Sequence, residues 1–289
     1  MNSLSFSFDG QKCLASSDDD SISIYLISTG TRDKKVFSKK YGVTHATFTK
    51  NSDRCIYGSN KKNDDIRYHD LNEDKYIRYF SGHQRSVVSL ANCNASQAEL
   101  FLSGSQDRTL RLWDVRSSHC QGFLKTQGTF ITLTFISDVQ LFLGIPIGAF
   151  DPEGCIFAAG IDSNIVRLYD IRTFDKGSFS TFHVQNTDKS EWKKLEFSGD
   201  GRQVNLFLVY LFKHIIPKIM ITTDGGSAKL IDAFSGDVMG SIRATGAAKR
   251  VGQSCYTPDG SMIVNGDETG KVHVYDSKRG QLVSFRLPK

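Results

Sequence analysis

A degenerate ten-residue pattern recurs six times along this chain, and it constrains the fold more than any other feature. The clearest copy occupies residues 105–114 and reads Ser-Gln-Asp-Arg-Thr-Leu-Arg-Leu-Trp-Asp. The last residues of the six copies are Leu26, Asp70, Asp114, Asp170, Asp232 and Asp276, at steps of 44, 44, 56, 62 and 44 residues. A period in the mid-forties indicates one supersecondary unit per copy, each stacked on its neighbours.

The residues around the clearest copy predict a small antiparallel sheet. Leu110 and Leu112 alternate with Thr109, Arg111 and Trp113, which is the period of a β-strand, and a turn at 106–108 precedes them. Asp, Gly and in places Pro recur at further chain reversals, at 9–10, 151–154, 198–201 and 257–260. A repeat of this length that ends in Trp-Asp is typical of a WD-repeat β-propeller. We therefore predict an all-β fold in which residues 1–289 form a single propeller domain.

Four residues of the third repeat match a structural motif of WD repeats. His83 follows a glycine, Ser103 or Ser105 lies on the second strand, Asp107 lies in the turn and Trp113 ends the third strand. Together they resemble the buried tetrad that hydrogen bonds turn to strand in such repeats. The chemistry fits, because Asp accepts, His relays and the indole N–H only donates. A Ser-His-Asp catalytic triad is the alternative, but equivalent positions recur from repeat to repeat.

Two apolar stretches lengthen the fourth and fifth repeats. They cover about residues 129–144 and 204–217, and removing them returns both steps to about the normal period. Each is short for a membrane span and is interrupted by Asp138 or by Lys213 and His214. We interpret both as anomalous insertions. Our hypothesis is that they are retained intron sequence, since an in-frame GT splice donor encodes a valine such as Val204.

Composition excludes several classes of function. The net charge is only +5, whereas nucleic-acid binding usually needs a concentrated basic stripe. The six cysteines form no C-x-x-C pair, and no hydrolase, metalloprotease or dinucleotide motif occurs. We expect no catalytic residue, no metal and no cofactor. We also expect no membrane attachment and no sequence-specific contact with nucleic acid.

Basic residues are the best candidates for binding a partner. The turns between second and third strands share one rim in WD propellers, and Lys61, Lys62 and Arg108 lie in or beside these turns. The other candidates on this rim are Lys39, Lys40 and Arg85. Such residues can hold a phosphorylated or acidic peptide through charge-assisted hydrogen bonds. The alternative for each residue is an ordinary solvated charge.

Six phrases go beyond what WD repeats have in common and carry a closer resemblance. They occupy residues 16–22, 38–43, 75–80, 150–160, 169–177 and 230–234. Together they resemble the WD repeat-containing protein 82 family, the propeller subunits of COMPASS-type histone methyltransferase complexes. The resemblance spans nearly the whole chain except the two insertions. It implies seven blades, of which six are visible here while the closing blade is incomplete.

The resemblance also implies a function. It indicates a nuclear, non-catalytic adaptor that links a SET-domain histone H3 lysine methyltransferase to the phosphorylated tail of RNA polymerase II. Protein phosphatase 1 and transcription-termination complexes are further implied partners. Two alternatives stay open: a WD adaptor of another assembly, such as a ubiquitin ligase receptor, and a propeller enzyme. An enzyme would need clustered inward-facing His, Asp or Glu residues, and the repeats contain no such set.

Overall fold

The structure is a computed structural model of the chain. It describes residues 2–93, 99–126, 145–186, 190–199, 218–223, 227–243, 251–257, 259–267, 271–278 and 280–286. The two predicted insertions, 129–144 and 204–217, lie outside these residues. The chain divides into two compact units, Met1–Gln127 and Gly128–Lys289, and each is described by itself. That the two units form a single domain stays a prediction.

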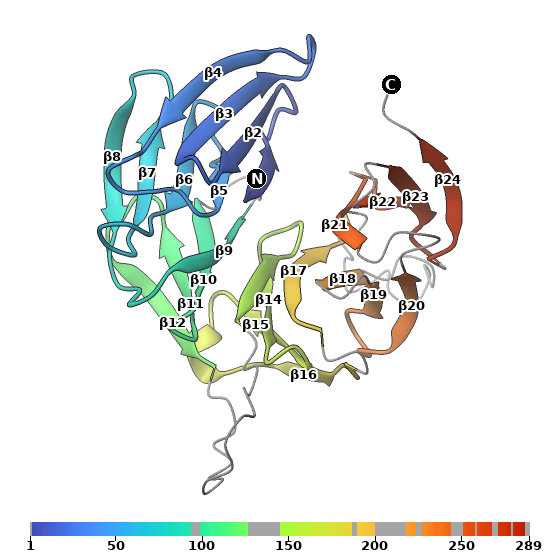
Figure 1. Cartoon of the computed structure of the whole chain (residues 1–289). Helices are drawn as coiled ribbons and strands as arrows, with labels where there is room; N and C mark the ends of the chain where they lie inside the picture. The colour runs from blue at the N-terminus through green and yellow to red at the C-terminus, as the bar shows by residue number, and fades with distance from the viewer. Residues whose placement is uncertain are drawn as a thin grey trace, which may run out of the picture. The chain divides into compact units, whose positions relative to one another are not determined.

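The first unit contains three four-stranded antiparallel sheets, which we call blades 1 to 3 (Figure 1). In each blade the strands follow one another in sequence order. Blade 1 has β1 (Ser3–Phe6), β2 (Lys12–Ser17), β3 (Ser21–Leu26) and β4 (Arg32–Phe37). Blade 2 has β5 (Ala46–Phe48), β6 (Arg54–Gly58), β7 (Ile66–Asp70) and β8 (Lys75–Phe80). Blade 3 has β9 (Val87–Asn92), β10 (Leu100–Ser105), β11 (Thr109–Asp114) and β12 (Cys120–Lys125).

The second unit has the same organisation, with blades 4 to 6. Blade 4 has β13 (Ile147–Phe150), β14 (Ile156–Ile161), β15 (Ile165–Asp170) and β16 (Ser180–His183), with a 3-10 turn, η1, at Phe174–Lys176. Blade 5 has β17 (Trp192–Phe197), β18 (Lys218–Thr223), β19 (Ser227–Asp232) and β20 (Val238–Arg243). Blade 6 has β21 (Val251–Tyr256), β22 (Met262–Asp267), β23 (Val272–Asp276) and β24 (Leu282–Arg286). These sheets confirm the all-β propeller prediction.

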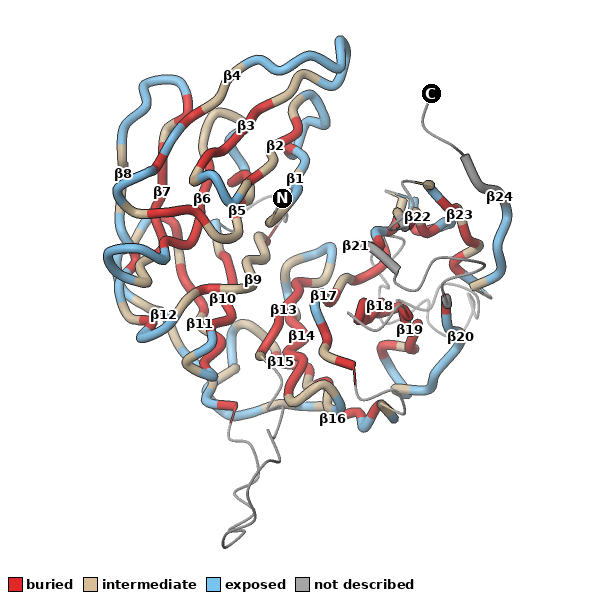
Figure 2. Tube along the Cα trace, in the orientation of Figure 1, coloured by how far each residue is buried: buried red, intermediate tan, exposed pale blue. Residues whose placement is uncertain are grey.

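Apolar cores lie between successive blades of each unit. Between blades 1 and 2, residues such as Leu14 and Ile24 pack with Phe48 and Cys55. The opposite face of blade 2 packs on blade 3 through Ile66, and the second unit repeats this arrangement. Successive side chains of a strand point to opposite faces of the sheet. Since blade 2 has a neighbouring blade on each face, its middle strands are buried on both faces. Figure 2 shows this burial along β6 and β7, whereas β4 is largely exposed.

The aligned aspartates have a local structural role. Each of the five follows the same rule at the end of its third strand: its carboxylate accepts a hydrogen bond from the backbone N–H two residues further on. The N···O distances are 3.0 Å at Asp70, 2.9 Å at Asp114, 2.8 Å at Asp170, 2.7 Å at Asp232 and 2.9 Å at Asp276. An aspartate at this position therefore stabilises the turn into the fourth strand.

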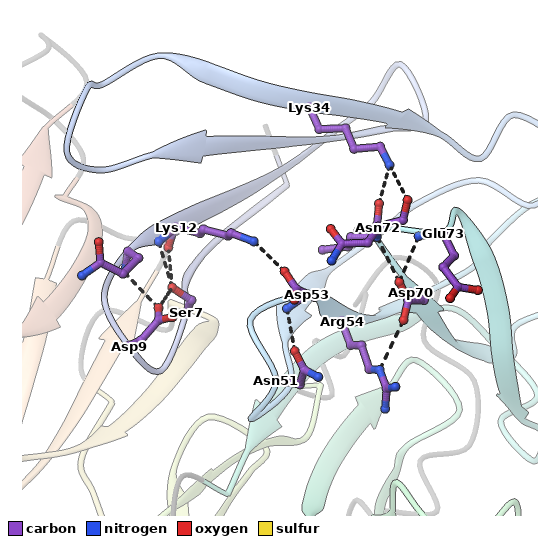
Figure 3. A network of polar contacts seen from close by, with 12 residues as sticks. Ser7, Asp9, Lys12, Lys34, Asn51, Asp53, Arg54, Asp70, Asn72 and Glu73 are labelled. Atoms are coloured by element: carbon purple, nitrogen blue, oxygen red, sulfur yellow. Dashed lines mark hydrogen bonds and ion pairs between the residues drawn. The ribbon is translucent and has the colours of Figure 1, made fainter.

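Figure 3 shows how such turns join neighbouring blades at one edge of the first unit. Lys12 Nζ of blade 1 lies 2.6 Å from Asp53 Oδ1 of blade 2. Lys34 Nζ, also of blade 1, donates to the backbone carbonyls of Leu71, at 2.5 Å, and Asn72, at 3.2 Å. The turns between second and third strands lie at the opposite edge, and that edge carries the candidate basic residues.

A chain of hydrogen bonds crosses blade 3. Trp113 Nε1 donates to Ser103 Oγ at 2.8 Å, and Ser103 Oγ lies 2.7 Å from His83 Nε2. His83 Nδ1 lies 2.9 Å from Asp107 Oδ2. All donors are satisfied if the Ser103 hydroxyl donates to a neutral His83 that in turn donates to Asp107. Ser105 instead donates to the Arg85 carbonyl at 2.7 Å.

Truncating this chain is expected to destabilise the protein. Trp113 and Ser103 are fully buried, and His83 is nearly so. Trp113→Ala should lower the free energy of unfolding by about 3–5 kcal/mol, the usual range for a large buried aromatic residue. His83→Ala should lower it by about 1–3 kcal/mol, because it leaves buried partners unsatisfied. Denaturant unfolding measures both, with Gln106→Ala in the exposed turn of the same blade as the control. If the two variants unfold like the control, the chain does not stabilise the blade.

His83 also makes stability depend on pH. Burial lowers the pKa of His83 despite the opposing effect of Asp107. In the unfolded chain His83 has the ordinary histidine pKa of about 6.5, so it binds a proton below that pH. In the folded protein its pKa is lower, so protonation favours the unfolded state. The stability that neutral His83 provides should be complete above that pH and lost as the pH falls. Unfolding measured from pH 7.5 to 5.5 should show a smaller loss for His83→Gln than for the parent. Equal losses of unfolding free energy in the two proteins would contradict this role. Some pH dependence should remain in both the parent and His83→Gln, because burial also lowers the pKa of His69.

Burial alone would raise the pKa of Asp107, but hydrogen bonds outweigh it. Thr109, the Gln84 backbone N–H and His83 all donate to this carboxylate and lower its pKa to about 2. Asp107 therefore stays ionised throughout the pH range of that measurement, and its own contribution is lost only in stronger acid.

Candidate functional site

The predicted basic residues all lie at the edge of the first unit that carries the turns between second and third strands. Lys39 and Lys40 follow β4, and Lys61 and Lys62 lie between β6 and β7. Arg108 lies between β10 and β11, and Arg85 precedes β9. All six residues are exposed. The structure brings the four lysines together at the junction of blades 1 and 2, whereas the two arginines belong to blade 3.

Backbone contacts hold the two lysine-bearing segments side by side. The Tyr41 carbonyl accepts hydrogen bonds from the N–H groups of Asn60, at 3.0 Å, and Lys61, at 2.9 Å. Gly42 has a φ of +76°, and a Cβ at this position would collide with the Asn60 side chain. The positive φ favours glycine here, whereas the collision alone would be relieved by movement of the exposed Asn60 side chain. This contact places Lys40 and Tyr41 beside Lys61 and Lys62.

The four lysines are in different environments. Lys61 forms an ion pair with Asp20 of blade 1. Lys39 Nζ lies 5.4 Å from the centre of the Phe37 ring, and Lys40 Nζ lies 5.1 Å from the centre of the Tyr41 ring. Both distances are within the range of a cation–π contact. Lys62 follows Lys61, whose N–H donates to the Tyr41 carbonyl, and the charge of Lys62 is the smallest of the causes that lower the pKa of the Tyr41 phenol.

Tyr41 is the residue on which these charges converge. The hydrogen bond from Lys40 is the main cause that lowers the pKa of the Tyr41 phenol, and the charges of Lys40, Arg67 and Lys62 act in the same direction. The Tyr41 side chain is half-buried, so its hydroxyl combines a fixed ring with access to solvent. A group that bound there would meet the charges of Lys40, Arg67 and Lys62, while Asp20 pairs with Lys61 and Asp65 accepts from Asn63.

The sequence analysis did not identify Arg67, the buried member of this cluster. Its side chain is only 2% exposed, and its guanidinium carbon lies 3.4 Å from the centre of the Tyr41 ring and 4.9 Å from that of Tyr79. Arg67 Nη2 donates to Asn63 Oδ1 at 2.9 Å. Arg67 is three residues before the end of its repeat, as are Arg111 and Arg167. That recurrence could have indicated a shared structural position for these arginines, but it does not reveal which of them is covered by a tyrosine.

The described residues offer few features typical of other site classes. Within them, no group of three or more His, Cys, Asp or Glu side chains is arranged to hold a metal ion. No helix in the described ranges has the length and apolar character needed to cross a membrane. His83, Ser103 and Asp107, the set that resembles a catalytic triad, form the hydrogen-bonded chain inside blade 3, where Ser103 is fully buried. The exposed basic rim is therefore the candidate site.

Comparison with known proteins places the chain in a family. The family model "WD domain, G-beta repeat" matches residues 1–26 and 74–114. WD repeat-containing protein 82 of Drosophila melanogaster is 38% identical over 287 residues, which cover 98% of this chain and 80% of the relative.

Two fungal proteins are also similar over most of their length. The COMPASS component SWD2 of Saccharomyces cerevisiae is 30% identical over 96% of this chain and 76% of its own. The Set1 complex component swd2 of Schizosaccharomyces pombe is 30% identical over 100% of this chain and 71% of its own. The repeats, the six blades and these near-complete alignments together establish that the chain belongs to the WD repeat-containing protein 82 family of WD-repeat β-propellers.

Proposed function

We propose that this chain is a non-catalytic WD-repeat adaptor of a COMPASS-type histone H3 lysine methyltransferase complex in the nucleus. One observation carries the proposal: two relatives that align with nearly the whole chain are named as components of COMPASS and of the Set1 complex. The six-sheet architecture supports it, because a propeller displays many loops to partners. The function lies in those loops rather than in the fold itself.

The finer part of the proposal concerns what the adaptor joins. It links a SET-domain methyltransferase to the phosphorylated tail of RNA polymerase II, and it also serves protein phosphatase 1 and transcription-termination complexes. The exposed basic rim of the first unit supports a phosphorylated partner, because a phosphate carries nearly two negative charges and several acceptor oxygens. The rival assignment is a WD adaptor of another assembly, such as a ubiquitin ligase receptor.

Purification of the tagged chain from its native cells tests the adaptor role. We expect a SET-domain methyltransferase to co-purify and to be identified by mass spectrometry, together with the polymerase. An untagged culture and an unrelated tagged WD protein are the controls. Recovery of ubiquitin ligase subunits in place of the methyltransferase would favour the rival assignment.

Charge reversal on the rim tests the link to the polymerase. The combined variant Lys61→Glu, Lys62→Glu, Arg108→Glu should lose the phosphorylated tail peptide and keep the parent's melting temperature. Each exposed contact should contribute only about 0.2–1 kcal/mol, so the effect requires several changes together. Binding by the parent should weaken as salt rises past physiological strength, where the screening length is about 8 Å.

A matched variant controls for total charge. Arg32→Glu, Lys75→Glu and Arg116→Glu also reverse three exposed charges, but at the opposite edge of the same unit. This variant should bind the peptide like the parent. If the rim variant binds equally well, the adaptor contacts the polymerase through other loops.

A further inference from the structure

The lysines at the junction of blades 1 and 2 are not equivalent, although all four are exposed. Lys61 is neutralised by Asp20, and Lys39 lies over the Phe37 ring rather than over Tyr41. Lys40 and Lys62 are different. Neither of them takes part in the ion pairs formed within the described residues. Lys40 Nζ lies 5.1 Å from the centre of the Tyr41 ring, and Lys62 follows Lys61, whose N–H donates to the Tyr41 carbonyl.

Arg67 adds a third positive charge beneath Tyr41. Its guanidinium lies under the phenol ring at stacking distance, and Asn63 fixes one of its terminal nitrogens. Arg67 Nε is buried and has no hydrogen-bond partner among the described residues. Arg67 forms no ion pair within the described residues: aromatic rings and Asn63 solvate it, and Asn63 in turn donates to Asp65. Its positive charge is therefore available to attract an anion that approaches Tyr41.

The backbone of this cluster is rigid before any ligand binds. Two N–H groups donate to the Tyr41 carbonyl, and Gly42 adopts a positive φ that favours glycine, so the backbones of the two segments are held together. Tyr79 and Tyr76 lie on further sides of the guanidinium, with ring centres 4.9 and 5.6 Å from its carbon. Little backbone entropy is therefore lost when the cluster receives a ligand, and the main entropic cost is that of ordering the exposed Lys40 and Lys62 side chains.

We propose that the phosphate of a phosphoserine peptide binds over Tyr41, where the Lys40 and Lys62 ammonium groups and the Tyr41 hydroxyl donate to its oxygens. Arg67 is a positioning residue that holds the ring from below and adds its charge. The inference rests on the proposed function, since that function brings a phosphorylated tail to this rim. It deepens the proposal by placing the phosphate at the junction of blades 1 and 2 rather than on blade 3.

The chemistry favours a phosphate ester over a carboxylate. Two ammonium groups and a hydroxyl match three acceptor oxygens, and the extra charge of a dianion interacts with all three cations. A glutamate peptide offers one charge and two oxygens, so it should bind more weakly. The preference for phosphoserine over glutamate is therefore a property of this site.

Two double variants provide the decisive comparison. Lys40→Gln with Lys62→Gln removes the two proposed donors, and Lys39→Gln with Lys61→Gln removes equal charge from the same two segments. Fluorescence anisotropy with a phosphoserine peptide of the polymerase tail should show a loss of roughly tenfold or more for the first pair. The second pair should lose less than about twofold. Equal losses in both pairs would mean diffuse attraction to the rim and would overturn the site.

Variants at the ring test the geometry of the site. Tyr41→Phe keeps the ring on Arg67 but removes the hydroxyl, so the ratio of phosphoserine to glutamate affinity should fall by about threefold. Arg67→Lys keeps the charge but loses the planar stack, and it should lower the same ratio. Arg111→Lys is the matched control in blade 3, where the guanidinium carbon lies 5.5 Å from the Phe123 ring centre. If Arg67→Lys fails to fold, Tyr41→Phe still decides the question.

The remaining outcomes separate this inference from the proposed function. If the parent binds the phosphopeptide and neither Tyr41→Phe nor the Lys40–Lys62 pair changes its affinity, the site is wrong while the polymerase link stands. If the parent does not bind the peptide, both are wrong, and co-purification with the methyltransferase decides the adaptor role alone. Equal affinity for a single-stranded RNA of the same charge would also overturn a phosphopeptide site.

Discussion

Each blade of this protein must bury apolar side chains against a neighbouring blade of its unit, and most of the structure depends on that constraint. A four-stranded sheet is too small to form a core alone. Within the first unit, the middle strands of blade 2 therefore pack on blade 1 with one face and on blade 3 with the other. In β7, Ile66 and Tyr68 pack toward blade 3, while His69 stacks on the half-buried Tyr76 that packs on the core between blades 1 and 2. The junctions between blades are therefore the most constrained places in each unit.

The repeats tolerate variation where this packing can be kept. Only the third repeat has tryptophan at the penultimate position, where Phe101 stacks on it with ring centres 6.2 Å apart. In the fourth repeat Tyr169 stacks on Phe157 at 5.0 Å, so a smaller aromatic residue fills the equivalent place. Ile231 replaces the aromatic residue in the fifth repeat and is fully buried. The aspartate that follows performs a local task in the turn, which explains why it recurs more regularly.

The sequence predicts the local features well, because short-range chemistry determines them. The third strands end at the six aligned positions, and the aspartates accept backbone N–H groups only two residues away. Contacts between blades could not be predicted in the same way. Nothing near Tyr41 in the sequence indicates that its carbonyl meets Asn60, or that Arg67 lies beneath its ring. These contacts arise only when the segment that links blades 1 and 2 packs on blade 2.

This difference explains why a list of exposed basic residues is a poor guide to a binding site. Lys39, Lys40, Lys61 and Lys62 look equivalent in the sequence, yet Asp20 neutralises Lys61 and the Phe37 ring lies beside Lys39. Surface charges in water contribute little one by one, whereas a cation held in a fixed array around a buried guanidinium interacts more strongly. The site therefore depends on burial: the segment that links blades 1 and 2 packs on blade 2 and places the half-buried Tyr41 over Arg67, whose side chain is 2% exposed and forms no ion pair within the described residues.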